Sequence, residues 1–173
     1  QVGTFVKTAS PHVIEILGGS GLDFAVLDAE HAPLDRAMLD LMMLAGRAAD
    51  LPLLVRIADS RPASFLSVLD MGAAGVLVPH VDTVAQAEAA VASARFRGGS
   101  RGYSSSPRFA GYGSLGMAKA LTAGDQAVVS PASPPTTCTR TLSLPVVTLR
   151  METTVVSGPS AWTTSTPRSS HPT

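Results

Sequence analysis

Residues 1–129 repeat one hydrophobic pattern: a short apolar run, then glycine or proline, then a segment with apolar positions at helical spacing. The apolar runs predict strands over residues 3–7, 24–28, 52–57 and 75–79, and the second run continues through residue 31. The segments between them predict helices over residues 10–17, 34–49, 62–71 and 84–95. A fifth apolar run starts at residue 126.

The predicted strands are short and almost wholly apolar, which is typical of a parallel sheet buried on both faces. Their ends at His31, Arg56 and Pro79 lie 25 and 23 residues apart, a compact strand-helix period. Four such units and the start of a fifth fit either half of a (β/α)₈ barrel or a small doubly wound α/β sheet. The chain has 173 residues, whereas a complete barrel needs about 250.

The composition changes abruptly near residue 130. Ser, Thr and Pro make up 26 of the 44 residues from Ser130 to Thr173. Such a segment has little apolar surface to offset its ordering entropy, so we expect it to be disordered or loosely attached. The sequence therefore predicts an ordered part over residues 1–129 and a tail over residues 130–173. The change falls inside the fifth predicted strand, which starts at Gln126.

Charge and cysteine content exclude several classes of function. Thirteen Lys and Arg balance thirteen Asp and Glu, which gives no electrostatic signal for nucleic acid or an anionic membrane. There is no apolar stretch of membrane-spanning length and no secretory signal in the first residues. The single cysteine, Cys138, excludes an internal disulfide and a multi-cysteine metal site. We expect a cytoplasmic protein that acts on a small molecule.

Candidate chemistry gathers where the predicted parallel strands end, because ligands bind at the carboxyl ends of such strands. Three groups are expected there: Asp28-Ala-Glu-His31, Arg56 and His80. An arginine in an apolar strand indicates an anionic ligand such as a carboxylate or enolate. The alternative is a structural ion pair of Arg56 with Asp28 or Glu30.

The remaining candidates each have two interpretations. His31 follows two acids, so it is either a general base or a loop histidine that caps the next helix. His80 is expected at an exposed loop start. Asp70 lies in the last turn of a helix, where the dipole disfavours an acid, so it has either a cationic partner or a solvated carboxylate. The glycine-rich segment 98–113 either closes over an anionic substrate or connects two elements.

Four motifs in this order resemble the HpcH/HpaI aldolase family. They are Phe24-Ala-Val-Leu-Asp-Ala-Glu-His-Ala-Pro33, Leu54-Val-Arg-Ile57, Leu69-Asp-Met-Gly-Ala-Ala-Gly-Val-Leu-Val-Pro79 and Arg101-Gly-Tyr103. The resemblance covers nearly all of residues 1–129. It implies a (β/α)₈ barrel, of which this chain holds about the first four to five units, and a family-type homo-oligomer, often a hexamer.

The resemblance also implies roles for individual residues. His31 corresponds to the catalytic acid/base, and Arg56 to the residue that binds the pyruvyl end and stabilises the enolate. Asp70 corresponds to an acid that raises the basicity of the histidine across a subunit boundary. Asp28 supports the histidine, and Arg101 is carried over as a substrate-binding residue.

The reaction that the resemblance implies is reversible retro-aldol cleavage of a 4-hydroxy-2-oxo or 2-dehydro-3-deoxy acid to pyruvate and an aldehyde, with Mg²⁺ or Mn²⁺ as Lewis acid. The family's metal ligands, a Glu after strand five and an Asp after strand six, find no matching motif here. Glu152 is the only acid of the tail. We therefore expect an impaired enzyme, with an inactive fragment or a citrate-lyase-like thioester lyase as alternatives. A frame-shifted reading from about Ser130 would explain the tail, and retranslation of the gene tests it.

Overall fold

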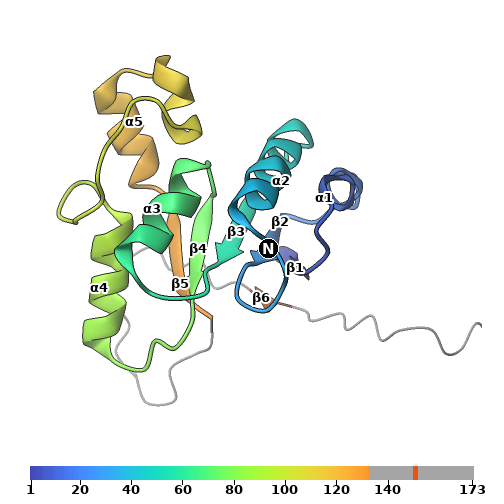
Figure 1. Cartoon of the computed structure of the whole chain (residues 1–173), viewed down its shortest axis with the longest axis horizontal. Helices are drawn as coiled ribbons and strands as arrows, with labels where there is room; N and C mark the ends of the chain where they lie inside the picture. The colour runs from blue at the N-terminus through green and yellow to red at the C-terminus, as the bar shows by residue number, and fades with distance from the viewer. Residues whose placement is uncertain (133–149, 152–173) are drawn as a thin grey trace, which may run out of the picture.

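The computed structural model describes residues 1–132 and 150–151, in which strands and helices alternate (Figure 1). All strands are parallel and form one sheet in the order β5-β4-β3-β2-β1-β6. The strands are β1 (Val2–Val6), β2 (Phe24–Asp28), β3 (Leu53–Arg56), β4 (Gly75–Val78), β5 (Val128–Pro131) and β6 (Arg150–Met151). The helices are α1 (Pro11–Gly18), α2 (Arg36–Ala48), α3 (Pro62–Asp70), α4 (Val84–Ala94), the 3₁₀ helix η1 (Arg108–Gly113) and α5 (Met117–Gly124).

The strand order decides between the two predicted architectures. Strands β1 to β5 lie side by side in chain order, whereas a doubly wound sheet reverses direction at a switch point. Helices α1 to α4 contribute to one apolar cluster only, and they pack there against alternate strand residues such as Leu27 and Val55. The other strand residues, including Val26 and Leu54, form a separate cluster on the opposite face. The sheet is therefore wound in one direction, as in a barrel, and the doubly wound alternative is wrong.

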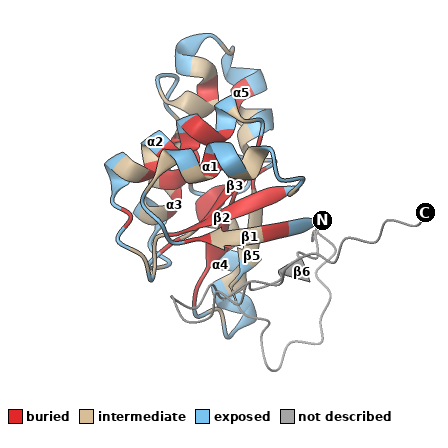
Figure 2. Ribbon diagram, turned by 90° about the vertical axis from the view of Figure 1, so that its right-hand side faces the viewer, coloured by how far each residue is buried: buried red, intermediate tan, exposed pale blue. Residues whose placement is uncertain are grey.

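Burial explains why the strands read as continuous apolar runs. All five residues of β2 and all four of β4 are buried, and Figure 2 shows buried residues along the central strands and on the sides of the helices that face them. Both faces of these strands are covered, so their residues are apolar except Asp28 at the end of β2. Among the described residues, no helix combines the length and apolarity that crossing a membrane requires.

Local hydrogen bonds set the ends of the elements. The second strand ends at Asp28 and does not continue through His31 as predicted, because Asp28 Oδ1 accepts hydrogen bonds from the backbone N–H groups of Glu30 and His31 at 3.2 and 3.1 Å. These bonds turn the chain at the carboxyl end of the sheet. Helix α2 then starts after Asp35, whose carboxylate accepts the Met38 N–H at 2.8 Å.

The fifth unit contains features that the hydrophobic pattern does not predict. Helix α5 is one of them, since it starts after Gly116 with neither a side-chain cap nor a proline to mark its first turn. Strand β5 runs from Val128 to Pro131 and so passes the predicted composition break at residue 130. Most of the predicted tail, residues 133–149 and 152–173, lies outside the described residues.

Candidate functional site

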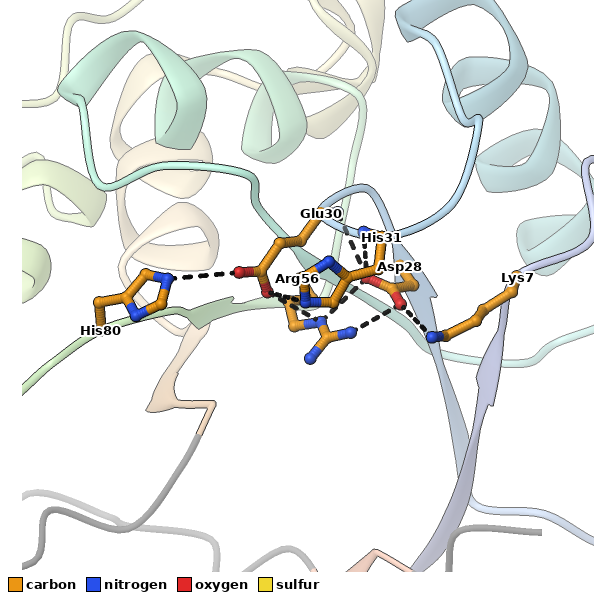
Figure 3. Close-up of polar contacts among 6 residues, drawn as sticks. All are labelled: Lys7, Asp28, Glu30, His31, Arg56 and His80. Atoms are coloured by element: carbon orange, nitrogen blue, oxygen red, sulfur yellow. Dashed lines mark hydrogen bonds and ion pairs between the residues drawn. The ribbon is translucent and has the colours of Figure 1, made fainter. Parts of the chain in front are cut away.

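Polar side chains from adjacent strands converge at the carboxyl ends of β1, β2 and β3, a region that we call the rim (Figure 3). Asp28 is the last residue of β2, and Arg56, its register partner, is the last residue of β3. Lys7 directly follows β1. Glu30 and His31 come from the turn after β2. Strand pairing thus brings together groups that are up to 49 positions apart in sequence.

Asp28 and Arg56 form a two-pronged ion pair at the base of the rim. Arg56 Nε donates to Asp28 Oδ1 at 2.9 Å, and Arg56 Nη2 donates to Oδ2 at 2.6 Å. Asp28 is fully buried, and burial alone would raise the pKa of its carboxyl. The hydrogen bonds from Arg56, the His31 backbone and Lys7 outweigh burial and lower this pKa from 3.8 to about 2. The carboxylate therefore stays charged and fixes the plane of the guanidinium.

Glu30 is the second carboxylate of the rim, and three basic side chains contact its two oxygens. Arg56 Nε lies 3.3 Å from Glu30 Oε2, and His31 Nε2 lies 3.6 Å from the same oxygen. On the other side, His80 Nε2 lies 3.6 Å from Oε1. The pKa of Arg56 is raised, first by its hydrogen bond to Asp28 and further by the charges of Asp28 and Glu30.

The two candidate catalytic groups differ in exposure. The His31 side chain is 59% exposed, so its ring is open to a ligand while one edge faces Glu30. The Arg56 side chain is 17% exposed and lies over the Phe5 ring, with 5.0 Å from Cζ to the ring centroid. An exposed imidazole beside a carboxylate suits proton transfer, and a guanidinium of fixed orientation suits binding of a small planar anion. The sequence offered a structural ion pair with Asp28 or Glu30 as the alternative role of Arg56. Arg56 forms these ion pairs and is also partly exposed to a ligand.

His80 has an unusual backbone at the rim. It follows β4 with a φ of 54°, in the left-handed region that few non-glycine residues adopt, and its side chain is 85% exposed. The sequence predicts this exposure. The contact of His80 with Glu30 depends on the pairing of β4 with its neighbours and has no local sequence signal.

Lys7 is the rim residue that the sequence analysis missed. Its Nζ lies 3.3 Å from Asp28 Oδ2. The available signal was the same as for Arg56, a cation at the carboxyl end of an apolar strand.

Asp70 and Arg101 lie at the end of the sheet opposite the rim. Asp70 is the last residue of α3, and its chain returns from there to the amino end of β4. Arg101 Nη2 donates to Asp70 Oδ1 at 2.9 Å, so of the two alternatives for Asp70, a cationic partner and a solvated carboxylate, the structure has the first. The Arg101 guanidinium lies between the rings of Phe96 and Phe109, at 4.3 and 4.6 Å from their centroids. Burial lowers the pKa of Arg101, although Asp70 opposes this effect.

This placement corrects the expected position of Arg101 within one chain. Its side chain is 1% exposed at the end of the sheet opposite His31, so it does not reach a ligand at the rim of its own chain. The later part of the glycine-rich segment 98–113, which contains η1, lies at the same end, beside α5 at the top of Figure 1. Arg108 anchors it there through Asp40 at 2.8 Å and the Met71 carbonyl at 2.8 Å. The segment connects α4 to α5 and does not close over the rim of its own chain.

The described residues of the rim do not form a metal site. Within residues 1–132 and 150–151, no three His, Cys, Asp or Glu side chains are arranged to hold a metal ion. Glu30, His31 and His80 form ion-pair contacts instead, at 3.6 Å between each imidazole and the carboxylate. The described residues therefore do not fit the divalent ion that the family resemblance implies.

Comparisons with known proteins agree on one family. The family model described as HpcH/HpaI aldolase/citrate lyase matches residues 1–138. A 5-keto-4-deoxy-D-glucarate aldolase of Klebsiella pneumoniae is 40% identical over 96 residues, which are 56% of this chain and 38% of that protein. The crystal structure of an HpcH/HpaI aldolase/citrate lyase family protein from Burkholderia cenocepacia matches with a TM-score of 0.70 and 30% identity, over 75% of this chain and 53% of that one.

A second solved structure, an HpcH/HpaI aldolase from Desulfitobacterium hafniense, gives a TM-score of 0.69 and 25% identity, over 75% of this chain and 51% of that one. The chain thus spans less than half of the curated relative and about half of each solved structure.

Proposed function

The chain belongs to the HpcH/HpaI aldolase/citrate lyase family, and from this premise we propose that its rim serves the retro-aldol cleavage of a 4-hydroxy-2-oxo or 2-dehydro-3-deoxy acid. The products are pyruvate and an aldehyde. The observation that carries the proposal is that Arg56 and His31 approach the same oxygen of Glu30, Oε2, at 3.3 and 3.6 Å, at one end of a parallel sheet. This is the end at which barrel enzymes bind their substrates.

Arg56 is the anion-binding group of the proposal. Asp28 holds Nε and Nη2, so the guanidinium cannot rotate freely when a ligand arrives. A substrate carboxylate or 2-oxo oxygen binds at its remaining edge. As the C3–C4 bond breaks, negative charge moves to the C2 oxygen, and a cation of fixed position stabilises that charge without reorganising.

His31 is the acid/base of the proposal. It removes the proton of the C4 hydroxyl, the C4–O bond becomes the aldehyde carbonyl, and the electrons of the C3–C4 bond form the pyruvate enolate. The enolate is then protonated at C3 to give pyruvate. Glu30 Oε2 lies 3.6 Å from His31 Nε2, so a carboxylate oxygen faces the ring that takes up the proton.

Asp70 and Arg101 enter the proposal only through a second copy of the chain. Both lie at the end of the sheet opposite His31 in their own chain. A role for Asp70 beside His31 therefore requires a homo-oligomer in which the amino end of one sheet meets the rim of another. We retain such an assembly as part of the proposal.

The divalent ion, Mg²⁺ or Mn²⁺, is likewise carried over from the resemblance. Since the described residues do not supply a ligand set, no step is assigned to the ion here. We expect cleavage by this chain to be far slower than by an intact relative, because Lewis-acid stabilisation of the enolate needs those ligands. Turnover equal to that of an intact relative would contradict this expectation.

Exchange of the methyl protons of pyruvate for deuterium tests the proposal without requiring a complete cleavage cycle. The chain is incubated with pyruvate in D₂O with Mg²⁺ supplied, and the methyl signal is followed by ¹H NMR. We expect exchange above the buffer rate in the wild type and in His12→Asn, an exposed histidine on α1. Exchange should fall to the buffer rate in His31→Asn. Equal rates in the wild type and His31→Asn would refute the assignment of His31.

A further inference from the structure

Lys7 is placed where it faces a ligand at the rim. It directly follows β1, which pairs with β2 so that the ends of both strands lie side by side. The Lys7 side chain is 56% exposed, whereas the neighbouring Arg56 is 17% exposed. Lys7 is therefore the more exposed of the two cations that contact the Asp28 carboxylate, and Figure 3 shows both contacts.

Asp28 does not need Lys7 to satisfy its hydrogen-bonding capacity. Its Oδ1 accepts from Arg56 Nε and from two backbone N–H groups, and its Oδ2 accepts from Arg56 Nη2 at 2.6 Å. Lys7 Nζ is a further donor at 3.3 Å, the longest of these contacts. A half-exposed ion pair of this length contributes little to folding, and the ammonium has two more N–H groups to offer.

The balance of charge gives Lys7 a role toward anions. Arg56 contacts two carboxylates, those of Asp28 and Glu30. Without Lys7, these three groups would carry a net negative charge that repels an incoming acid. Lys7 brings the set to neutrality and adds an exposed cation at the position where the repulsion would act.

The distance between the two cations fits a short ligand with two acidic groups. Arg56 Nη2 and Lys7 Nζ contact the same oxygen, Asp28 Oδ2, at 2.6 and 3.3 Å. The two nitrogens therefore lie within about 6 Å of each other, and the flexible lysine stem extends this reach. A ligand that places one carboxylate on Arg56 would carry a second one to Lys7 across a chain of a few carbons.

We propose that Lys7 is a specificity-determining residue that binds a second carboxylate of the substrate, so that the site prefers dicarboxylic 2-oxo acids to monocarboxylic ones. In the cleavage direction, this second carboxylate belongs to the aldehyde fragment. The inference deepens the proposed function and rests on it for the 2-oxo group, but the contact of Lys7 with a carboxylate is independent of the reaction.

Matched pairs of acids test the inference through binding. The purified full chain is titrated by calorimetry with 2-oxoglutarate and 2-oxopentanoate, which differ only in the terminal carboxylate, and with pyruvate. Succinate and butyrate form a second pair without the 2-oxo group. The variants are Lys7→Met, Lys7→Arg and the control Lys119→Met, which removes the only other lysine, an exposed residue on α5.

We expect the wild type and Lys119→Met to prefer 2-oxoglutarate to 2-oxopentanoate by about fivefold, as for an exposed charge pair. Lys7→Met should bind both equally, Lys7→Arg should keep part of the preference, and 0.5 M salt should reduce it. A Lys7→Met variant that keeps the preference, or that loses affinity for both acids alike, would overturn the inference.

The same titrations separate the two proposals. If pyruvate does not bind but succinate still binds better than butyrate in a Lys7-dependent way, the proposed function fails and the role of Lys7 stands. If pyruvate binds and Lys7 has no effect on either pair, the role of Lys7 fails alone. Circular dichroism of each variant verifies that the fold is retained.

Discussion

Replacing Asp28 by asparagine tests the energetics of the rim, because the substitution removes the charge and keeps the shape. The pKa of Asp28, about 2 in the fold against 3.8 as the ordinary value, corresponds to about 2.5 kcal/mol of stabilisation from the charged form. The variant also removes one of the two carboxylates that contact the mostly buried Arg56, and breaking a buried pair costs about 3–5 kcal/mol. We expect Asp28→Asn to lower the free energy of unfolding by about 2–5 kcal/mol at pH 7.

The pH dependence of this loss is part of the prediction. Since the pKa of Asp28 is lowered by folding, its contribution is complete above about pH 4 and disappears as the pH falls toward 2. The free energy of unfolding of the wild type and of Asp28→Asn is measured by urea unfolding, followed by circular dichroism, at pH 7 and at several pH values below 4. The control Asp82→Asn, an exposed acid before α4, should change stability by less than about 0.5 kcal/mol. A difference between Asp28→Asn and the wild type that stays constant between pH 7 and pH 2 would refute the reasoning.

Three further substitutions test other parts of the fold. Thr83→Ala removes the capping box of α4 and should cost about 1 kcal/mol in urea unfolding; an unchanged midpoint would show that the cap is dispensable. Gly75→Ala places a Cβ 2.6 Å from the Val128 carbonyl oxygen and should cost about 1–3 kcal/mol by separating β4 from β5, so a more stable variant would contradict the packing of β5. Asp70→Asn leaves the buried Arg101 charge without its partner and should cost about 3 kcal/mol, and a thermal midpoint equal to the wild type would show that this pair is not formed.

Local sequence signals were sufficient to predict the strands and helices of the first four units. Short apolar runs at a regular spacing predict strands β1 to β4, because each of these strands is covered on both faces. The choice between a barrel and a doubly wound sheet needed the strand order, which depends on contacts between segments and leaves no mark in the period of any one of them. The main local error was to extend the second strand through His31. The pattern does not distinguish an aspartate that closes a turn from one more residue of the strand.

The candidate site was partly predictable from the sequence, because several of its residues lie at the ends of predicted strands. Asp28, His31 and Arg56 end adjacent strands or follow them, so the strand rule alone places them together. Lys7 obeys the same rule but lies outside the four motifs that the sequence analysis singled out. The pair of Asp70 and Arg101 joins residues 31 positions apart through loop packing, which no periodicity encodes.

The central claim is that His31 and Arg56 bind one small anion together. Oxalate, a planar mimic of the pyruvate enolate, tests this claim when it is titrated into the ¹⁵N-labelled chain and followed by NMR. The account predicts that the Arg56 Nε–H signal and the His31 ring signals shift together with a single dissociation constant, and that Arg56→Lys weakens the effect on His31. Shifts at only one of the two residues, or at neither in a folded chain, would contradict it.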